Sequence, residues 1–410
     1  MTTETIHSTG IAGQTVSTRI ASIDVFRALT MAVMIFVNEL SEVKGLPWWT
    51  YHAPGKADVM TYVDMVFPFF LFILGVSMPI AVAQRLKRNA SLPGLWGHVF
   101  VRSLSLIMLG YILANAEKAD PNRMVLNGGA WALLALLSAA LYLNVYSKSE
   151  KSAALFTILK YLGLGGVIVL FAFFRRSTHN GDAAWLDPGY PEILGLIGFT
   201  YLATSVLYIP TRRKPWAAWV WLVVLVTLCA FSTAKLLRFP NKLPLYLWPF
   251  GNGGMASIIM VGVITSSIFL NARVAAETRR ALLMGASFGV FLLGVGWALT
   301  PLGISKIRCT PTWCLYSAGA GVLLFTTLYW LCDVRKRTAW ASFVRPAGSN
   351  TLLTYLLPDL WYFFFFALGV TYLDTHFSAG LAGVFKSVLF TALMLALAAI
   401  LTRAKVRLQL

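Results

Sequence analysis

The stretch VDMVFPFFLFILGVSM, residues 63–78, decides the fold class of this protein. After Asp64 it contains no charged side chain, and its apolar character continues to about residue 84. A helix of roughly 20 residues crosses the ~30 Å hydrocarbon layer of a membrane, so the run is long enough to span one. It does not alternate polar with apolar residues as the shorter strands of membrane barrels do. The stretch therefore predicts a membrane-spanning helix over residues 60–84.

The composition of the whole chain points the same way. Of its 410 residues, 58% are hydrophobic and only 12% are charged, and the mean hydropathy is +0.71. Soluble domains carry about 25% charged residues. Comparable apolar runs cover residues 20–40, 60–84, 99–116, 125–146, 153–174, 192–209, 215–234, 254–271, 281–300, 312–332, 348–370 and 381–402. The sequence thus predicts an all-α integral membrane protein, a polytopic bundle of about 12 (10–12) transmembrane helices.

The loop charges predict how the bundle is oriented. Lysine and arginine are nearly twice as frequent in one alternate set of loops, which includes both terminal segments, as in the opposite set. The positive-inside rule therefore places both termini in the cytoplasm. In a bacterium the membrane would be the inner (cytoplasmic) membrane, and the loop after the first span would face the periplasm. The net charge of +18 follows from the same loops, which face anionic lipid. Without a soluble basic face, we expect no binding of nucleic acid.

The chain divides simply. Residues 1–18 are polar and rich in Ser and Thr, which predicts a disordered cytoplasmic tail. They lack the basic start and early apolar core of a signal peptide, so the first span is expected to act as an uncleaved membrane signal. Residues 19–410 are expected to form a single transmembrane domain.

The four cysteines, Cys229, Cys309, Cys314 and Cys332, show no metal-ligand spacing, and no metal site is expected. Cys309 and Cys314 could pair as a disulfide in an oxidising compartment, or remain free thiols.

Charged side chains inside the predicted spans are informative, because each costs about 3 kcal/mol or more to insert at the bilayer centre. Asp24 and Arg27 lie three residues apart, on one helical face. They can form a structural ion pair, or Arg27 can use its spare donors on the phosphate of an anionic cofactor; both can hold at once. Asn38 follows three turns later, on roughly the same face at the other end of the helix.

His52 lies in the short loop WWTYHAPG, residues 48–55, between the first two spans. Imidazole exchanges protons near neutral pH, so this histidine is the candidate for acid–base chemistry. A purely structural loop histidine is the alternative, and His376 is the rival candidate. Asp64 opens the next span, where it could cap the helix or orient the imidazole.

Several segments together carry a family resemblance. They are RIASIDVFRALTMAVMIFVN (19–38), HA (52–53), VDMVFPFFLFILGVSM (63–78), PEILGLIGFTYL (191–202), SKIRCTPTWCLYSAG (305–319), LYWLCDV (328–334) and PAGSNTLLTYL (346–356). In this order they resemble the transmembrane acetyltransferases related to heparan-alpha-glucosaminide N-acetyltransferase. The resemblance covers most of the chain and is most specific in the first 80 residues. Residues 125–174 look like a helix pair added to the family core.

The resemblance implies transfer of acetyl from cytoplasmic acetyl-CoA to an amino or hydroxyl group of a sugar or glycan across the membrane. It implies that His52 is the catalytic base or acetyl carrier, with Asn38 beside it, and it suggests a homodimer. Asp64 completes the expected catalytic set. The residues expected to contact acetyl-CoA are Arg19, Asp24, Arg27, Arg102, Lys306 and Asn350. For Lys306 and Asn350, helix packing through side-chain hydrogen bonds is the equal alternative.

Two other functions remain open from the sequence. Twelve helices with intramembrane Asp and Arg residues would also suit a secondary transporter, although no internal repeat supports that reading. A membrane subunit of a glycan-export system is the other alternative.

Overall fold

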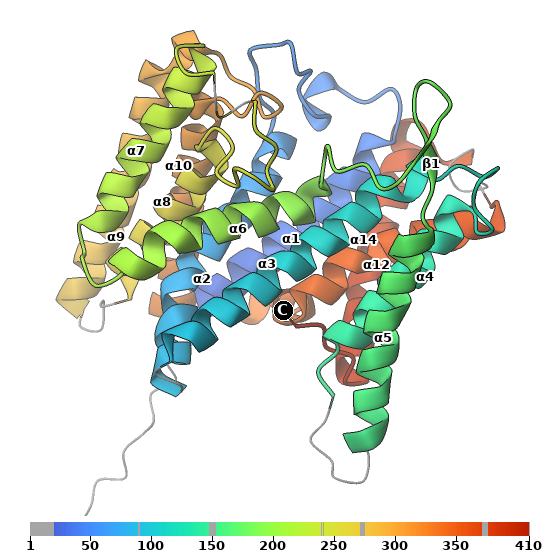
Figure 1. The fold of residues 1–410 in the computed structure, drawn as a ribbon. Helices are drawn as coiled ribbons and strands as arrows, with labels where there is room; N and C mark the ends of the chain where they lie inside the picture. Colours follow the sequence, from blue (N-terminus) through green and yellow to red (C-terminus); the bar gives the residue numbers. More distant parts are fainter. Residues whose placement is uncertain are drawn as a thin grey trace, which may run out of the picture.

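The computed structural model describes residues 20–88, 91–146, 153–238, 240, 242–270, 275–370 and 376–409. The predicted tail, residues 1–18, and the candidate site residue Arg19 lie outside these ranges. Helices dominate the rest and pack side by side as a bundle (Figure 1). The helices of its first half are α1 (Ala21–Ser41), α2 (Val66–Arg88), α3 (Leu92–Asn115), α4 (Gly128–Leu143), α5 (Ala153–Phe173) and α6 (Glu192–Thr211).

The second half continues the bundle. Its helices are α7 (Ala217–Thr233), α8 (Gly254–Phe269), α9 (Ala275–Ala298), α10 (Pro311–Leu328), the short α11 (Arg345–Ser349), α12 (Thr351–Leu368) and α14 (Gly380–Arg403). Short 3-10 turns occupy Trp48–Thr50, Tyr62–Met65, Ala116–Lys118, Thr300–Leu302 and Ala339–Ala341, and a π-helical turn, Tyr329–Val334, extends α10. A two-stranded antiparallel hairpin, β1 (Arg176–Ser177) and β2 (Ala183–Ala184), was not predicted from the sequence.

Each apolar run expected from the sequence contains a helix. Within the described ranges, nine helices are long and apolar enough to cross a membrane, and α4, α7 and α8 are shorter apolar helices. The prediction of a polytopic helical membrane protein is confirmed at this level. The expected span over 348–370 contains the candidate span α12, which begins only at Thr351, because Asn350 leaves helical geometry (φ −135°, ψ 57°) and separates α11 from α12.

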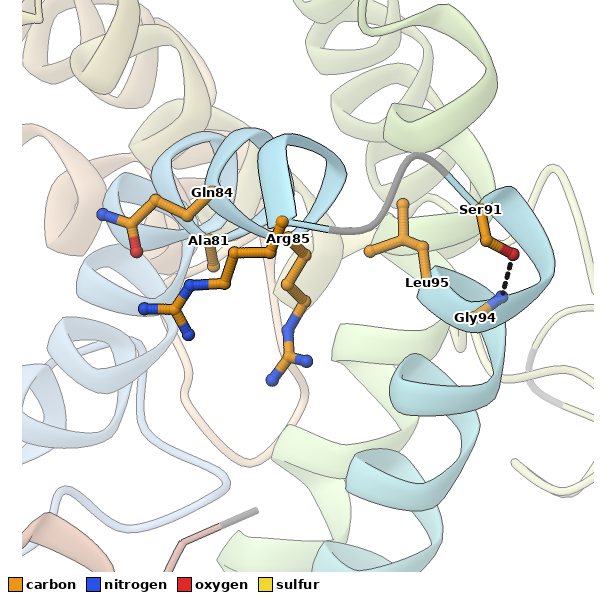
Figure 2. A pocket seen from close by; sticks show the side chains of 7 residues that line it. Ala81, Gln84, Arg85, Ser91, Gly94 and Leu95 are labelled. Carbon is orange, nitrogen blue, oxygen red and sulfur yellow. Dashed lines mark hydrogen bonds between the residues drawn. The ribbon is translucent and has the colours of Figure 1, made fainter.

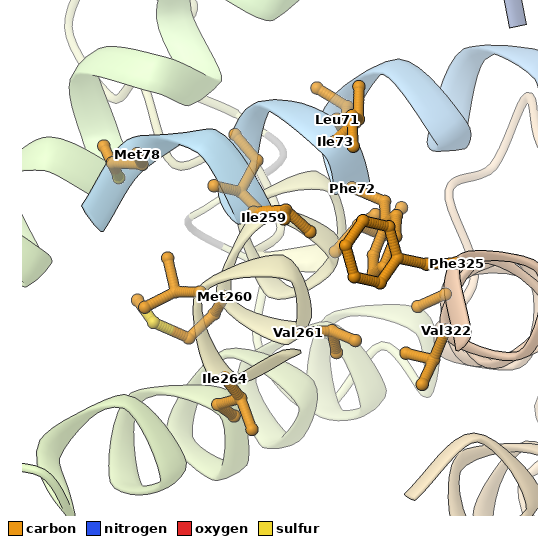
Figure 3. Close-up of a cluster of buried hydrophobic side chains, with 14 of the residues drawn as sticks. Leu71, Phe72, Ile73, Met78, Ile259, Met260, Val261, Ile264, Val322 and Phe325 are labelled. Atoms are coloured by element: carbon orange, nitrogen blue, oxygen red, sulfur yellow. The ribbon is translucent and has the colours of Figure 1, made fainter. Parts of the chain in front are cut away.

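One part of the core lies where α2, α8 and α10 meet (Figure 3). Phe72 and Phe325 stack edge to face there, with ring centroids 6.2 Å apart. Gly75 and Gly262 form the crossing of α2 and α8: a Cβ at Gly75 would lie 2.0 Å from the carbonyl oxygen of Ile259. Small residues allow this close approach of helix backbones, which stabilises packing in a membrane where apolar contact alone does not.

A second part of the core gathers α1, α3, α4, α12 and α14 around Trp131, Leu109 and Ile35. Helix α1 contributes to both parts, since Phe26 packs in the first and Ile35 in the second. By contrast, α5 packs on α4 at the edge of the bundle and buries only Gly163 and Val167. That edge position is compatible with the expected added pair over 125–174, which stays a prediction.

The start of α1 is held by a distant carboxylate. The backbone N–H groups of Ala21 and Ser22 donate to Asp333 at 2.7 and 2.9 Å. Asp333 therefore acts as the N-terminal cap that α1 lacks in its own sequence. Elsewhere Cys309 and Cys314 are free thiols with their Sγ atoms 3.9 Å apart, so the free-thiol alternative describes this structure.

Candidate functional site

The loop that carries His52 is fastened by its own tyrosine. The Tyr51 hydroxyl donates to the carbonyl of Val43 at 2.6 Å and accepts the N–H of Leu46 at 3.0 Å. Because both partners belong to the start of the loop, the chain turns back on itself and brings the following residue toward the bundle. Figure 1 shows this loop, between α1 and α2, at the opposite end of the bundle from the last turn of α2 and the first turn of α3.

Asp64 holds the imidazole of His52. One carboxylate oxygen, Oδ1, lies 2.7 Å from His52 Nδ1, and the other accepts the N–H groups of Thr61 and Ala53 at 3.1 and 3.2 Å. Asp64 also forms a capping box with Thr61 at the turn that leads into α2. The cap and the orienting contact, which the sequence left as alternatives, are therefore both present.

The contact with Asp64 determines which nitrogen of the neutral imidazole carries the proton. The Asp64 side chain is 1% exposed and that of His52 is 43% exposed. An ionised carboxylate only accepts hydrogen bonds, so Nδ1 carries the proton opposite Asp64 and the neutral ring keeps its lone pair on Nε2. The arrangement thus fixes the ring and leaves one basic nitrogen for chemistry.

Lys306 completes the group from the connection between α9 and α10. Its Nζ lies 3.4 Å from His52 Nδ1, although the two residues are 254 positions apart. Burial lowers the pKa of the Lys306 ammonium below its ordinary value, while the nearby carboxylates of Asp64 and Glu192 oppose that shift. A cation, an imidazole and a carboxylate therefore meet at one point.

His52, Lys306 and Asn38 line a cavity of about 20 Å³, which we call the histidine cavity. Its remaining walls are apolar side chains of α1, of α2 and of the 3-10 turn before α2, with Ile193 from α6. Asn38 is an exposed residue and lines this cavity together with His52. A space of this size holds about one water molecule. It shares lining residues with two larger cavities, which are described next.

One neighbour, the acidic cavity, has a volume of about 740 Å³ and shares Met34, Asn38 and Ile193 with the histidine cavity. Its charged lining residues are Glu39, Glu42, Lys44, Glu117, Glu192, Asp359 and Lys386. Glu39 is neutralised, since Lys386 binds it at 2.8 Å and the Tyr362 hydroxyl donates to it.

Glu192 lines the acidic cavity and is not among the site residues predicted from the sequence. It begins α6 with φ 53°, a left-handed conformation that costs a non-glycine residue on the order of 1–3 kcal/mol. Its carboxylate accepts the N–H of Ile193 at 3.1 Å. Its position inside PEILGLIGFTYL was the available signal, because an acidic residue there precedes an apolar span.

The other neighbour, the arginine cavity, has a volume of about 360 Å³ and shares Phe70 with the histidine cavity. Arg27 and Arg102 line it. Arg27 donates to the Ser77 hydroxyl at 3.0 Å and approaches Asp24 at 3.8 Å, so the expected ion pair is present and is loose.

Arg102 is held differently. Its guanidinium lies over the Tyr201 ring, 5.0 Å from the centroid. Within the described part of the chain, its buried Nε has no hydrogen-bond partner. A buried donor without a partner costs about 1–3 kcal/mol, so this cavity is poised for an acceptor such as a phosphate or an amide oxygen.

The structure brings some predicted site residues together and separates others. His52, Asn38, Asp64 and Lys306 meet, and Arg27, Arg102 and Asp24 gather around the arginine cavity. Asn350 is buried apart from both groups: its amide donates to Thr402 and Val406 and accepts from Leu408. That geometry matches the packing alternative for Asn350.

Among the residues that the structure describes, no group of three His, Cys, Asp or Glu side chains could hold a metal ion.

Comparisons with known proteins show which proteins this chain is similar to. The family described as a domain of unknown function (DUF5009) matches residues 19–248, more than half of the chain. Heparan-alpha-glucosaminide N-acetyltransferase of Homo sapiens is 36% identical over 97 residues, which cover 24% of this chain and 14% of the human protein. The Mus musculus protein of the same name is 35% identical over 97 residues, with the same coverage. The match thus spans a small part of these relatives, and it confirms the resemblance.

Proposed function

This chain belongs to the DUF5009 family, and on that premise we propose that it is a transmembrane acetyltransferase. It takes acetyl from acetyl-CoA on the cytoplasmic side and transfers it to an amino or hydroxyl group of a sugar or glycan on the opposite side. The observation that carries the proposal is the His52–Asp64 contact of 2.7 Å, placed with Lys306 where two large cavities adjoin.

His52 acts through Nε2. It accepts the proton of the acceptor amine or hydroxyl as that group attacks the thioester carbonyl, and the imidazolium that forms is stabilised by Asp64. The same proton then passes to the departing thiolate, so the ring returns to its neutral form. In the alternative route Nε2 itself attacks the carbonyl and the C–S bond breaks, so that CoA leaves as the thiolate and His52 carries the acetyl group. The acceptor amine or hydroxyl then attacks this acetyl-imidazole, loses its proton and releases the neutral ring.

Asn38 and Lys306 support the reacting carbonyl. The amide of Asn38 is exposed into the histidine cavity, where it can donate a hydrogen bond to the oxyanion that develops. The ammonium of Lys306 lies at the same point and favours negative charge on the thioester oxygen. Lys306 therefore binds the acetyl end of acetyl-CoA rather than its phosphates.

The arginine cavity suits the body of acetyl-CoA. Arg27 and Arg102 offer guanidinium donors to its amide and phosphate oxygens, and Asp24 positions Arg27. Arg19 remains a proposed contact at the cytoplasmic mouth. Asn350 acts indirectly. Its hydrogen bonds to the C-terminal segment fix the start of α12, where the next two residues, Thr351 and Leu352, line the arginine cavity.

The proposed orientation has both termini in the cytoplasm and about 12 spans in a bacterial inner membrane. The loop of His52 then faces the periplasm, and the acidic cavity opens toward the acceptor. A homodimer is part of the same proposal.

The test uses detergent-purified protein with radiolabelled acetyl-CoA and a panel of amino sugars and neutral sugars. We expect acetylated product from the wild type, and none from His52→Ala while acetyl-CoA still binds. Asn38→Ala should reduce the rate with little change in affinity. A wild type that neither binds acetyl-CoA nor releases CoA contradicts the proposal.

The series of adjoining cavities would also suit a secondary transporter, which is the alternative. Uptake or exchange of labelled sugar by reconstituted protein, without release of CoA, would favour it.

A further inference from the structure

A further cavity lies between the end of α2 and the start of α3 (Figure 2). Its volume is about 310 Å³. Gln84, Arg85 and Arg88 form the wall on the α2 side, while Ser91 and Gly94 form the wall on the α3 side. We call it the α2–α3 cavity. Of its lining residues, only Ala81 also lines the arginine cavity described above.

The charge in this cavity is uncompensated. Arg85 and Arg88 lie three residues apart, on one face of α2, and both are exposed. The charged groups that act electrostatically on Arg85 include two more guanidinium groups, those of Arg88 and Arg102. In the described ranges, no carboxylate lines the cavity or forms an ion pair with Arg85 or Arg88. Like charges held together repel, so this arrangement favours a bound anion.

The opposite wall adds to that preference. Helix α3 begins there with Ser91 as its cap, whose hydroxyl accepts the N–H of Gly94 at 3.2 Å. The first turn of a helix carries a partial positive charge and attracts phosphate groups. Two arginines and the positive end of a 24-residue helix thus line the same cavity.

The α2–α3 cavity is in line with the proposed site. Ala81 lines both this cavity and the arginine cavity, and Phe70 lines both the arginine cavity and the histidine cavity. The α2 segment from Phe70 to Arg85 rises about 22 Å, at 1.5 Å per residue. A ligand that reaches from His52 to Arg85 must therefore be long and thin.

We propose that the α2–α3 cavity binds the 3′-phosphate at the nucleotide end of acetyl-CoA, with Arg85 and Arg88 as its guanidinium clamp. This inference rests on the proposed function. The chain from the CoA sulfur to the 3′-phosphate is as long as roughly seven extended residues, or about 24 Å at full stretch, which matches the path along α2. Guanidinium groups bind phosphate in a bidentate geometry, which explains arginine rather than lysine at both positions.

An anionic lipid headgroup offers the same phosphate chemistry, so the test must separate the two sources. Full-length protein is reconstituted in nanodiscs of phosphatidylcholine alone and of phosphatidylcholine with phosphatidylglycerol. The affinities for CoA and for dephospho-CoA, which lacks only the 3′-phosphate, are measured by titration calorimetry. We expect wild type to bind CoA at least tenfold more tightly than dephospho-CoA in both lipid mixtures.

Arg85→Gln/Arg88→Gln should abolish that preference and leave the affinity for dephospho-CoA unchanged. Lys87→Gln is the matched control, because Lys87 lies between the two arginines on α2 and does not line the cavity. It should keep the full preference. Arg88→Lys keeps the positive charge but lacks the paired N–H donors of a guanidinium group. This variant should fold normally and lose part of the preference for CoA over dephospho-CoA.

Three results would overturn the inference. If the double variant keeps the preference for CoA, the arginines do not bind the 3′-phosphate. If the double variant binds CoA as the wild type does but retains less phosphatidylglycerol, the occupant is a lipid. If wild type binds CoA and dephospho-CoA equally, this site fails alone, whereas a wild type that binds neither ligand removes the proposed function together with it.

Discussion

The two ends of α2 carry charge in opposite ways. At its start, Asp64 is buried and satisfied by His52, Thr61 and Ala53, and Lys306 lies beside the same imidazole. Toward its other end, Arg85 and Arg88 line a cavity to which no described residue contributes a carboxylate, and the buried Nε of Arg102 has no partner in the same part of the chain.

This difference between the two ends of α2 suits two different tasks, proton transfer at one end and ligand binding at the other. A group that must transfer protons benefits from partners that hold it in place before any ligand arrives, because no reorganisation is then needed during the reaction. A group that must bind a phosphate benefits from the absence of such partners, since an internal carboxylate would compete with the ligand. Substitutions near His52 should therefore harm activity and stability, whereas substitutions near Arg102 should harm binding alone.

The largest effect is expected from His52→Ala. Loss of a general base lowers a rate by about 10²–10⁴-fold, so kcat should fall by about 10³-fold while the affinity for acetyl-CoA is unchanged. Steady-state kinetics and equilibrium binding on the same preparation measure both. His179→Ala is the matched control, because His179 is also an exposed loop histidine and lies outside the site. Equal losses in the two variants would contradict a catalytic role.

Asp64→Asn comes next. The amide keeps the shape but no longer favours the Nδ1-protonated ring, so kcat should fall by about 10²-fold. The variant should also lose about 1–2 kcal/mol of stability, because a capping carboxylate is replaced. Thr61→Ala separates the two effects, since it weakens the capping box and leaves the His52 contact. It should lower the melting temperature and preserve kcat. A large loss of activity in Thr61→Ala would show that the cap, not the imidazole contact, matters.

Lys306→Met should reduce kcat/KM by about tenfold, since one favourable charge near the oxyanion is lost. The pH profile gives a sharper readout. Burial lowers the pKa of Lys306, so its ammonium deprotonates at a lower pH than that of an exposed lysine, and activity that needs the cation falls on the alkaline side. Lys306→Arg keeps its charge at all accessible pH values, so the alkaline limb should move to higher pH. An unchanged limb would mean that Lys306 does not act as a cation.

The smallest effect is expected from Arg102→Leu. The informative result is the direction in which the melting temperature changes. Acetyl-CoA affinity should fall about fivefold, which corresponds to roughly 1 kcal/mol. The melting temperature without ligand should stay the same or rise, because a buried donor without a partner is removed. Arg123→Gln, which disrupts a pair with Asp120 in a distant loop, is the control for binding. A marked loss of stability in Arg102→Leu would contradict the comparison between the two ends.

Local patterns in the sequence were enough for the helices and for part of the site. The apolar runs predicted the helices because length and hydropathy are local properties. Asp64 was a candidate partner of His52 because it lies only twelve residues away, at the start of a span. The sequence could not choose between capping and orienting, and the structure contains both contacts.

The remaining features depend on how distant segments pack. Lys306 meets His52 across 254 positions, and Asp333 caps α1 from more than 300 positions away. The left-handed Glu192 and the break at Asn350 are tertiary effects, since nothing in the apolar pattern of either segment predicts them. The α2–α3 cavity was not predicted from the sequence either. Basic residues at the end of a helix are already explained by the positive-inside rule, so Arg85 and Arg88 did not indicate a binding site.

Transfer of acetyl across the membrane through His52 requires that the two substrates react from opposite sides, which sealed vesicles can measure. Protein is reconstituted in sealed vesicles with one orientation selected, an amino sugar is enclosed inside, and radiolabelled acetyl-CoA is added outside. We expect labelled N-acetyl sugar inside the vesicles with wild type and none with His52→Ala. Product that forms only when both substrates share one compartment, or that persists in His52→Ala, would contradict it.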